Sequence, residues 1–424
     1  MIDRTQQPEI QKLNDVRLLD YQVNRLDNGI PVIVFSAGDQ EVTKVDLNFY
    51  AGSWHQQLPL IAPSVARLLK SGTDNHTAHE IAGYIDFYGA SMVSMANRDM
   101  SVVSMLSLNR HLDKMLALME EVVKKPAFPD HETEIYSRNQ KQRLEVNEQK
   151  VDYLAKTRFM NHLFGANHPY GLYLKSTYFE NLTRRNLIDF HQRYYNTSNC
   201  YILVSGNLPD NVLAMLNHHF GGNDWAGQPA DTKHFEISGS EPGNYHIPKK
   251  GAVQHSIRMG KVMFDRTHPD YPRMKIVNTI LGGYFGSRLM KNIREDKGYT
   301  YGIFSNIVSH RQQGYFTISA ETGSDVTEKA IAEIHKEIEK LQNDPVTDEE
   351  LKTVRNYMLG NALRSIDGAL AAGDFFKTLY ESGLDENYFY NYVNGIKTIT
   401  KEEIRELAQK YFDKDNFIQI IAGG

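Results

Sequence analysis

The sequence predicts an α+β protein built from two copies of one unit, each an antiparallel-rich sheet with helices on one face. Three observations lead to this prediction. A helix-turn-strand segment occurs twice, at Thr183–Gly206 and at Thr400–Gly423. Helix and strand patterns alternate in hairpins and pairs rather than in a strict βαβ series. The length of 424 residues also exceeds that of one ordinary domain.

The elements of the first half follow from short-range patterns. Asp27-Asn28-Gly29 between apolar stretches is a hairpin-turn signal, and residues 30–35 form the returning strand. Further along, apolar spacing predicts the following elements: a strand at 44–50, helices at 58–70 and 79–88, two strands within 91–108, an amphipathic helix along 112–123, and one long polar helix at about 132–163.

The repeat relates the two halves without gaps. Each copy is a helix that begins after a Thr, a polar turn that contains Asn, and an apolar strand that ends at Gly. Tyr194 and Tyr411 stand 217 positions apart, and the ends of the two segments have the same separation. A constant separation is typical of a duplicated unit, here of about 200 residues, which is an ordinary domain size.

Composition then sets the domain boundaries. Residues 221–250 are rich in Gly, Pro, Asp and Ser and have little periodic apolar pattern, which is typical of a linker. We therefore predict an N-terminal domain at 1–220, a linker at 221–250 and a C-terminal domain at 251–424.

Composition and charge also exclude several classes of protein. A hydrophobic share of 41% and a charged share of 23% are those of a soluble globular protein, and a net charge of −5 argues against nucleic acid or an anionic membrane as partner. No apolar run approaches a membrane span, and the first residues lack the apolar core of a signal peptide. Cys200 is the only cysteine, which excludes an intrachain disulfide and a thiolate zinc site. We expect a cytoplasmic protein.

The stretch 282–302 holds the most informative motif. Ser287 is expected to cap a helix that Gly298 ends, and a strand is expected directly afterwards. Arg294 then lies in the last turn of that helix and Tyr301 just inside the strand, so a guanidinium and a phenol come to one place. Together they offer a cation and an O–H donor to an oxygen that carries negative charge. On spacing alone, a solvated Arg and a packing Tyr are the better interpretation.

The sequence around Arg294 and Tyr301 favours a functional role over the structural interpretation. It reads Leu-Gly-Gly-x-Phe-x-Ser-Arg-Leu followed by Arg-Glu-x-x-Gly-x-x-Tyr. This closely resembles the C-terminal-domain signature of pitrilysin/insulinase-type zinc peptidases, which include the mitochondrial processing peptidase. The resemblance implies α/β-roll domains arranged as a clam-shell. It also implies that Arg294 and Tyr301 bind substrate near the scissile carbonyl.

The resemblance further implies where a zinc site would stand. Active members carry His-x-x-Glu-His on the first long helix, with two His as ligands and the Glu as general base. At these positions the sequence has Pro63, Ala66 and Arg67, which offer no ligand and no base. Glu145 and Glu148 lie about where the third ligand is expected, and without the two His we interpret them as helix-surface acids.

No other constellation replaces this site. His76 and His79 are three apart at a helix start, with no carboxylate placed as a base. His218 and His219 are adjacent and point to different sides of a helix. A nucleophile elbow and a phosphate-binding glycine loop are also missing from the sequence.

The sequence therefore predicts the non-catalytic subunit of a heterodimeric zinc peptidase. This chain would bind no cofactor, and a homologous partner with His-x-x-Glu-His would hold the zinc. Arg294 and Tyr301 would bind the peptide substrate in a shared cavity. The alternative is a structural or peptide-binding homodimeric scaffold with no peptidase role. Retention of Arg294 and Tyr301 in an intact motif favours the peptidase subunit.

Overall fold

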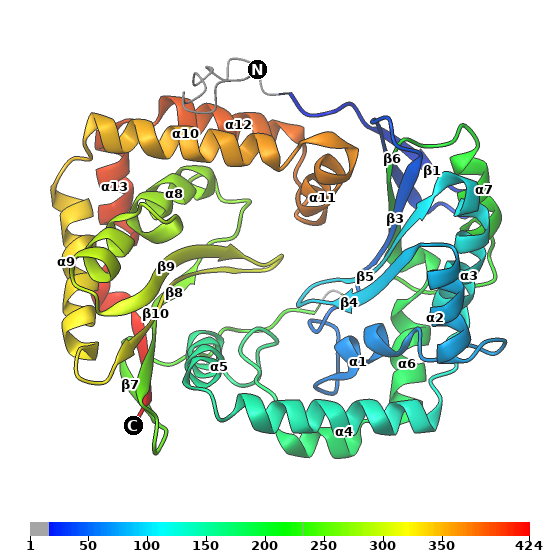
Figure 1. The fold of residues 1–424 in the computed structure, drawn as a ribbon, viewed down its shortest axis with the longest axis horizontal. Coiled ribbons are helices and arrows are strands. Elements are labelled where there is room, and N and C mark those ends of the chain that lie inside the picture. The colour runs from blue at the N-terminus through cyan, green and yellow to red at the C-terminus, as the bar shows by residue number, and fades with distance from the viewer. Residues whose placement is uncertain (1–16, 232) are drawn as a thin grey trace, which may run out of the picture.

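The computed structural model describes residues 17–231 and 233–424. Two halves face each other across a central space, each with a sheet toward the centre and helices on the outside (Figure 1). In each half the largest cluster of buried apolar side chains lies between the sheet and its own helices. In the part of the chain that the structure describes, no helix is long and apolar enough to cross a membrane.

The N-terminal half contains a six-stranded sheet in the order β1-β2-β6-β3-β5-β4. Neighbouring strands are antiparallel except β2 and β6, which are parallel. The strands are β1 (Gln22–Arg25), β2 (Pro31–Ser36), β3 (Val42–Phe49), β4 (Ser91–Ala96), β5 (Ser101–Leu108) and β6 (Cys200–Gly206). The helices are α1 (Ile61–Leu68), α2 (Ala78–Phe87), α3 (Leu112–Lys124), α4 (Asp130–Asn147), α5 (Val151–Phe164), α6 (Arg184–Tyr194) and α7 (Val212–Phe220).

The C-terminal half contains a five-stranded sheet in the order β7-β11-β8-β10-β9, in which only β7 and β11 are parallel. The strands are β7 (Gly243–Pro248), β8 (Gln254–Met263), β9 (Thr300–Ser309), β10 (Gly314–Gly323) and β11 (Ile418–Gly423). The helices are α8 (Tyr271–Asn278), α9 (Thr327–Asn343), α10 (Asp348–Arg364), α11 (Gly368–Glu381), α12 (Glu386–Thr398) and α13 (Lys401–Tyr411), together with two π-helices, η4 (Thr279–Gly283) and η5 (Met290–Asp296).

The two sheets confirm the predicted duplication. Strands β2-β6-β3-β5-β4 correspond in order and direction to β7-β11-β8-β10-β9. Helices α6 and α13 keep the separation of 217 positions at both ends. The predicted hairpin turn is also present, since Gly29 has φ of 89° between β1 and β2, a conformation that favours glycine.

A pair of equivalent helices crosses between the halves. Helix α5 packs on β8 and β11 of the C-terminal sheet, and α11 packs on β6 and β2 of the N-terminal sheet. The buried side chains Phe159 of α5 and Phe376 of α11 are 217 positions apart, so they are equivalent residues of the repeat. Each half thus covers part of the inner sheet face of the other, and the halves share two small apolar cores.

The prediction of one long helix at 132–163 is wrong. Helix α4 ends at Asn147 and α5 begins at Val151. The intervening Glu148-Gln149-Lys150 contains no Gly or Pro to announce a break. The break is a tertiary effect, because α5 changes direction to reach the other sheet.

The stretch 221–250, predicted as a linker, includes strand β7. Gly243–Pro248 pairs with β11 in the C-terminal sheet. Its residues alternate between exposed and half-buried, and only Tyr245 and Ile247 pack against the apolar cluster around α5. An edge strand with so few apolar side chains gives a weak periodic signal, which explains why composition indicated a linker there.

Candidate functional site

The Arg294 segment is a π-helix and not the capped α-helix that the sequence predicts. Leu289, Met290 and Ile293 are fully buried, and the wide turn of η5 lets all three face the core. Ser287 is buried, and its hydroxyl has no hydrogen-bond partner among the described residues, so it does not cap the helix. Gly298 does end the segment, with φ of 65°.

Arg294 lies in the last turn of η5, as predicted. Its side chain is half-buried, and the guanidinium carbon lies 4.8 Å from the ring centroid of Phe285. A cation over an aromatic face is attracted by the ring's negative centre. The glycine-rich turn therefore supplies a platform that orients the guanidinium and leaves its N–H groups available.

Tyr301 is the second residue of β9, an edge strand, and it sits in a β-bulge. Two residues, Tyr301 and Gly302, oppose Glu321 alone on β10. The Thr300 hydroxyl fixes the bulge, donating to the Glu321 carbonyl oxygen at 2.6 Å and accepting from the Gly302 N–H at 3.1 Å. The Tyr301 side chain is 91% exposed, so the bulge directs a phenol into open space.

No hydrogen bond joins Arg294 and Tyr301 in the described part of the chain. The two side chains come from neighbouring elements, the end of η5 and the start of β9, as the sequence predicts. Among residues 17–231 and 233–424, neither side chain has a hydrogen-bond or ion-pair partner. Their shared role toward one substrate oxygen stays a prediction.

The zinc-motif positions lie on α1, a short helix that serves packing. Ala66 is fully buried, Pro63 is half-buried and Arg67 is exposed. The Tyr136 hydroxyl of α4 lies 3.4 Å from the Ser64 hydroxyl beside them. The three positions offer a methyl group, a pyrrolidine ring and a cation, which do not fit a zinc ion.

The acids near the end of α4 do not repair this site. Glu145 is exposed and Glu148 is half-buried. Within residues 17–231 and 233–424, no three His, Cys, Asp or Glu side chains gather in a way that could hold a metal ion. The family's hydrolytic step therefore has no donor set on α1.

The histidine pairs separate as their spacing predicts. His76 holds its Nδ1 3.0 Å from a Glu121 oxygen, whereas His79 is exposed. His219 is buried between two carboxylates, Glu120 at 2.8 Å and Asp113 at 3.2 Å, and its neighbour His218 faces solvent. His76 and His219 thus contact carboxylates of α3, and their neighbours in sequence do not share these contacts.

A pocket between the halves was not predicted. Its volume is about 480 Å³, and it is lined by strands β3, β4 and β5, the two hairpin tips β4–β5 and β9–β10, the chain after β8, and α11. These segments lie up to several hundred positions apart in the sequence. No local motif marks them, and the only signal was the repeat, which places equivalent hairpins in both halves.

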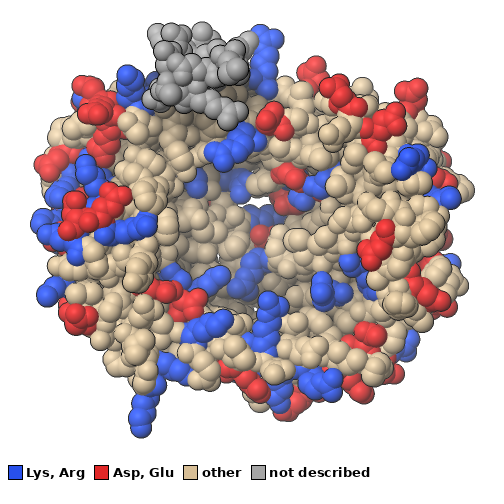
Figure 2. Space-filling model, in the orientation of Figure 1, with Lys and Arg blue, Asp and Glu red and all other residues tan. Residues whose placement is uncertain are grey.

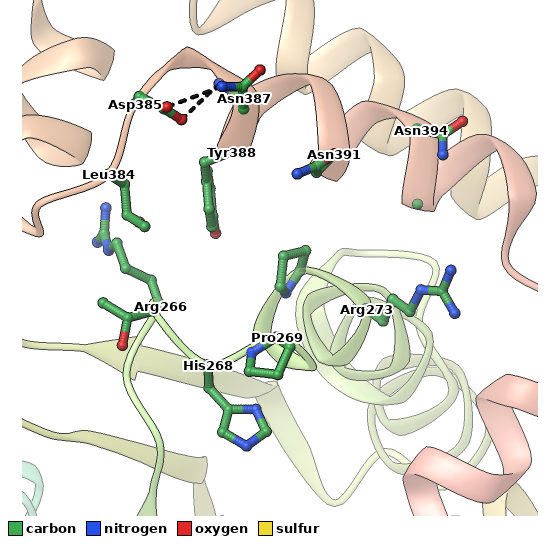
Figure 3. A pocket seen from close by; sticks show the side chains of 13 residues that line it. Arg266, His268, Pro269, Arg273, Leu384, Asp385, Asn387, Tyr388, Asn391 and Asn394 are labelled. Carbon is green, nitrogen blue, oxygen red and sulfur yellow. Dashed lines mark hydrogen bonds between the residues drawn. The ribbon is translucent and has the colours of Figure 1, made fainter.

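A second pocket, of about 450 Å³, lies between α12 and the chain before α8. Figure 3 shows Asn387, Asn391 and Asn394 along α12, facing Pro269 and Arg273 across the pocket. Asp385 accepts from the backbone and side-chain N–H groups of Asn387. This pocket contains neither Arg294 nor Tyr301.

Comparison with known families agrees with this geometry. Residues 34–170 match the family described as insulinase (peptidase family M16), and residues 181–358 match the peptidase M16 inactive domain. The chain belongs to the peptidase M16 family. This M16 chain is a peptidase-like member whose predicted zinc-motif positions, Pro63, Ala66 and Arg67, offer no zinc ligand.

Similar proteins span nearly the same length. An uncharacterized zinc protease YmxG of Bacillus subtilis is 21% identical over 93% of this M16 chain and 96% of its own. A protein named non-peptidase homolog YmxG of Helicobacter pylori is 24% identical over 83% and 81%. The group of similar proteins thus includes names of both kinds.

Solved structures share the fold. A peptidase M16 inactive domain from Pseudomonas fluorescens has a TM-score of 0.87 at 24% identity, covering 96% of this M16 chain and 98% of its own. A protease from Helicobacter pylori has a TM-score of 0.86 at 18% identity, covering 96% and 100%. The predicted fold class of two α/β units is confirmed.

Proposed function

We propose that this chain is the non-catalytic subunit of a heterodimeric zinc peptidase. A homologous partner with His-x-x-Glu-His would hold the zinc, and this chain would supply Arg294 and Tyr301 to the shared peptide-binding cavity. The observation that best supports this proposal is the bulge that exposes the Tyr301 phenol, together with the Arg294 guanidinium held over the Phe285 ring. Positions 63, 66 and 67 on α1 offer no zinc ligand.

The chemistry assigned to the two side chains is electrostatic. The partner's metal would supply a Lewis acid and an activated water. Tyr301 O–H and the Arg294 guanidinium would donate to the peptide oxygen on which charge develops during attack. A preorganised donor of this kind contributes about 2.7–4 kcal/mol to transition-state stabilisation. A subunit without metal is then still required for full activity.

The names of similar proteins support this division of labour. A protein named uncharacterized zinc protease and one named non-peptidase homolog are 21% and 24% identical to this chain. A family that keeps one fold in both kinds of chain can pair an active copy with an inactive one.

The test is steady-state peptide hydrolysis by this chain mixed with a zinc-bearing M16 chain from the same genome. Adding the wild-type chain should raise turnover. Arg294→Ala and Tyr301→Phe should each lower kcat/KM by at least about tenfold, and Tyr301→Phe should lower kcat more than it raises KM. Tyr390→Phe is the matched control, because Tyr390 is a partly exposed phenol on α12.

Two outcomes would overturn the proposal. Unchanged turnover in both variants would leave Arg294 and Tyr301 without a catalytic role and would favour the homodimeric scaffold. One tightly bound zinc per chain, with chelator-sensitive hydrolysis by the isolated protein, would place catalysis on this chain itself.

A further inference from the structure

The pocket between the halves is framed by equivalent hairpin tips. The β4–β5 tip carries Arg98 and Asp99, and the β9–β10 tip carries His310 and Arg311. Figure 2 shows blue Lys and Arg side chains gathered around the central hollow between the halves. The repeat therefore brings one arginine from each half to the same place.

The Asp99 carboxylate at the β4–β5 tip is hydrogen-bonded by two uncharged donors. One oxygen of the Asp99 carboxylate accepts from the Tyr170 hydroxyl at 2.6 Å, and the other accepts from the Arg311 backbone N–H at 3.0 Å. The Gln312 N–H donates to the same Tyr170 hydroxyl at 3.3 Å. Asp99 thus ties the two tips together.

Three arginines in the pocket form what we call the arginine trio: Arg98, Arg266 and Arg311. Arg98 donates to the Pro169 carbonyl oxygen at 2.9 Å. Arg266 donates to the Thr378 carbonyl oxygen at 3.3 Å, and Arg311 lies 4.5 Å from the Tyr50 ring centroid. In the described residues, none of the trio forms an ion pair. Burial lowers the pKa of Arg98, so this charge is held in the pocket at a cost.

The other charges leave the pocket positive. Lys44 and Lys377 each lie 3.4 Å from Asp46, a fully buried carboxylate. Glu381 accepts from the Tyr201 hydroxyl at 2.9 Å, and burial raises the pKa of Glu381 above its ordinary value. The lining thus holds five Lys and Arg side chains against three Asp and Glu side chains, and the arginine trio makes up most of this positive charge.

One wall of the pocket is apolar. Val93 and Met95 of edge strand β4 are 44% and 59% exposed, and Val102 of β5 lies beside them in the lining. Guanidinium forks match carboxylates and phosphates alike. The buried carboxylate of Asp46 and the apolar wall disfavour a polyphosphate chain and favour a ligand that alternates acidic and apolar groups.

We propose that this pocket binds an acidic peptide segment, with Asp or Glu carboxylates on the arginine trio and a neighbouring apolar side chain on Val93 and Met95. The proposal goes beyond the proposed function, because neither Arg294 nor Tyr301 lines this pocket. It rests on peptide binding by this chain and needs no partner subunit for its test.

The experiment is fluorescence anisotropy with the full chain and three labelled peptides in a Gly/Ser background. Their cores are Asp-Leu-Asp, Asn-Leu-Asn and Asp-Ser-Asp. The first should bind at least about tenfold more tightly than the second, the difference expected for charge-assisted hydrogen bonds to an anion. It should also bind more tightly than the third, which lacks the apolar side chain.

Variants assign the effect to the pocket. Arg311 is exposed, so Arg311→Gln should fold normally and weaken the Asp-Leu-Asp peptide by about tenfold. It should also reduce the preference for Asp over Asn. Arg185→Gln is the matched control, because it removes the same charge from an 80% exposed side chain on the outer helix α6.

Each contrary result has a defined meaning. Equal binding of the Asp and Asn peptides, or equal losses in the Arg311 and Arg185 variants, would overturn the proposal. Tighter, Arg311-dependent binding of a labelled single-stranded oligonucleotide would assign the trio to phosphates instead. If acidic peptides do not bind but this chain still stimulates the zinc-bearing chain, only the pocket proposal is wrong and the proposed function is unaffected. If acidic peptides bind but this chain does not stimulate the zinc-bearing chain, the pocket proposal is supported and the proposed function is wrong.

Discussion

The two halves build the same framework and use it differently. In the N-terminal half, α1, where the sequence predicts a degenerate zinc motif, is a packing element, with Ala66 fully buried. In the C-terminal half, the corresponding region opens into two π-helices and a bulge that exposes Tyr301. Both halves keep an apolar core, and the second half also exposes the Tyr301 phenol at the bulge.

This difference shows that the fold does not depend on catalytic side chains for its stability. The fold packs α1 through apolar side chains and needs no metal ligand there. Retention of an exposed phenol and an oriented guanidinium has no equivalent benefit for stability. Arg294 and Tyr301 are therefore the better candidates for a functional role, because packing does not require their polar groups.

The largest effect is expected at the exchanged helices, where the halves are alike. Phe159→Ala and Phe376→Ala should each lower the free energy of unfolding by about 3–5 kcal/mol, since both remove a buried aromatic side chain. Urea denaturation followed by circular dichroism should show one transition in both variants, because each helix belongs to the core of the opposite half. Two separate transitions would show that the halves unfold independently.

The second largest effect on stability is expected at α1, and it tests whether α1 is a packing helix. Ala66→Glu inserts a carboxyl group into a fully buried position and should lower the free energy of unfolding by about 2–4 kcal/mol. The neighbouring Arg67→Glu, on an exposed side chain, should change it by less than about 0.5 kcal/mol. Equal stability of the two variants would mean that α1 has room for the lost general base.

A smaller effect is expected on the pH dependence of stability, which differs between equivalent positions of the two halves. Burial lowers the pKa of His191 to about 4, although its ring donates to the Val123 carbonyl oxygen at 2.8 Å. The equivalent position in the second half is Ala408, which does not titrate. Because the unfolded chain binds the proton first, this contribution is complete above about pH 6.5 and is lost as the pH falls toward 4.

His191→Gln should therefore flatten the loss of stability between pH 7 and pH 5 by about 1–2 kcal/mol. Urea midpoints of the variant and the wild type, measured across that range, give the comparison. His218→Gln, on an exposed ring of α7, should leave the slope unchanged. A slope that stays the same in the His191 variant would mean that other groups cause the pH dependence.

The smallest effect is expected at Tyr301. Tyr301→Phe removes a hydroxyl from a side chain that is 91% exposed, and the free energy of unfolding should change by less than about 0.5 kcal/mol. Tyr170→Phe should cost about 1–3 kcal/mol, since that hydroxyl joins the hairpin tips. A large loss in the Tyr301 variant would give that phenol a structural role.

Much of the fold was predictable from the sequence because its signals are local. The Asn28-Gly29 turn, the alternation within 91–108 and the constant register of the repeat all correspond to observed elements. The break between α4 and α5 was not predictable, since the cause is a sheet in the other half. Strand β7 was missed because few of its residues are apolar.

The candidate site divides in the same way. Arg294 and Tyr301 stand in one continuous motif, so their places at the end of a helical segment and at the start of a strand were predicted correctly. The π-helical turns and the bulge were not, because both arise from packing of Leu289, Met290 and Ile293 and from the Thr300 hydroxyl. The arginine trio has no sequence signature, since it assembles only when the two halves meet.

The exchange of α5 and α11 has a topological consequence. Two separate copies of one half, each lending a helix to the other, would be a domain-swapped dimer. This chain has the connectivity of such a dimer joined into one polypeptide, with its two swapped segments tethered at all times. The association that a swapped dimer achieves by concentration is here intramolecular, so dilution does not separate the halves.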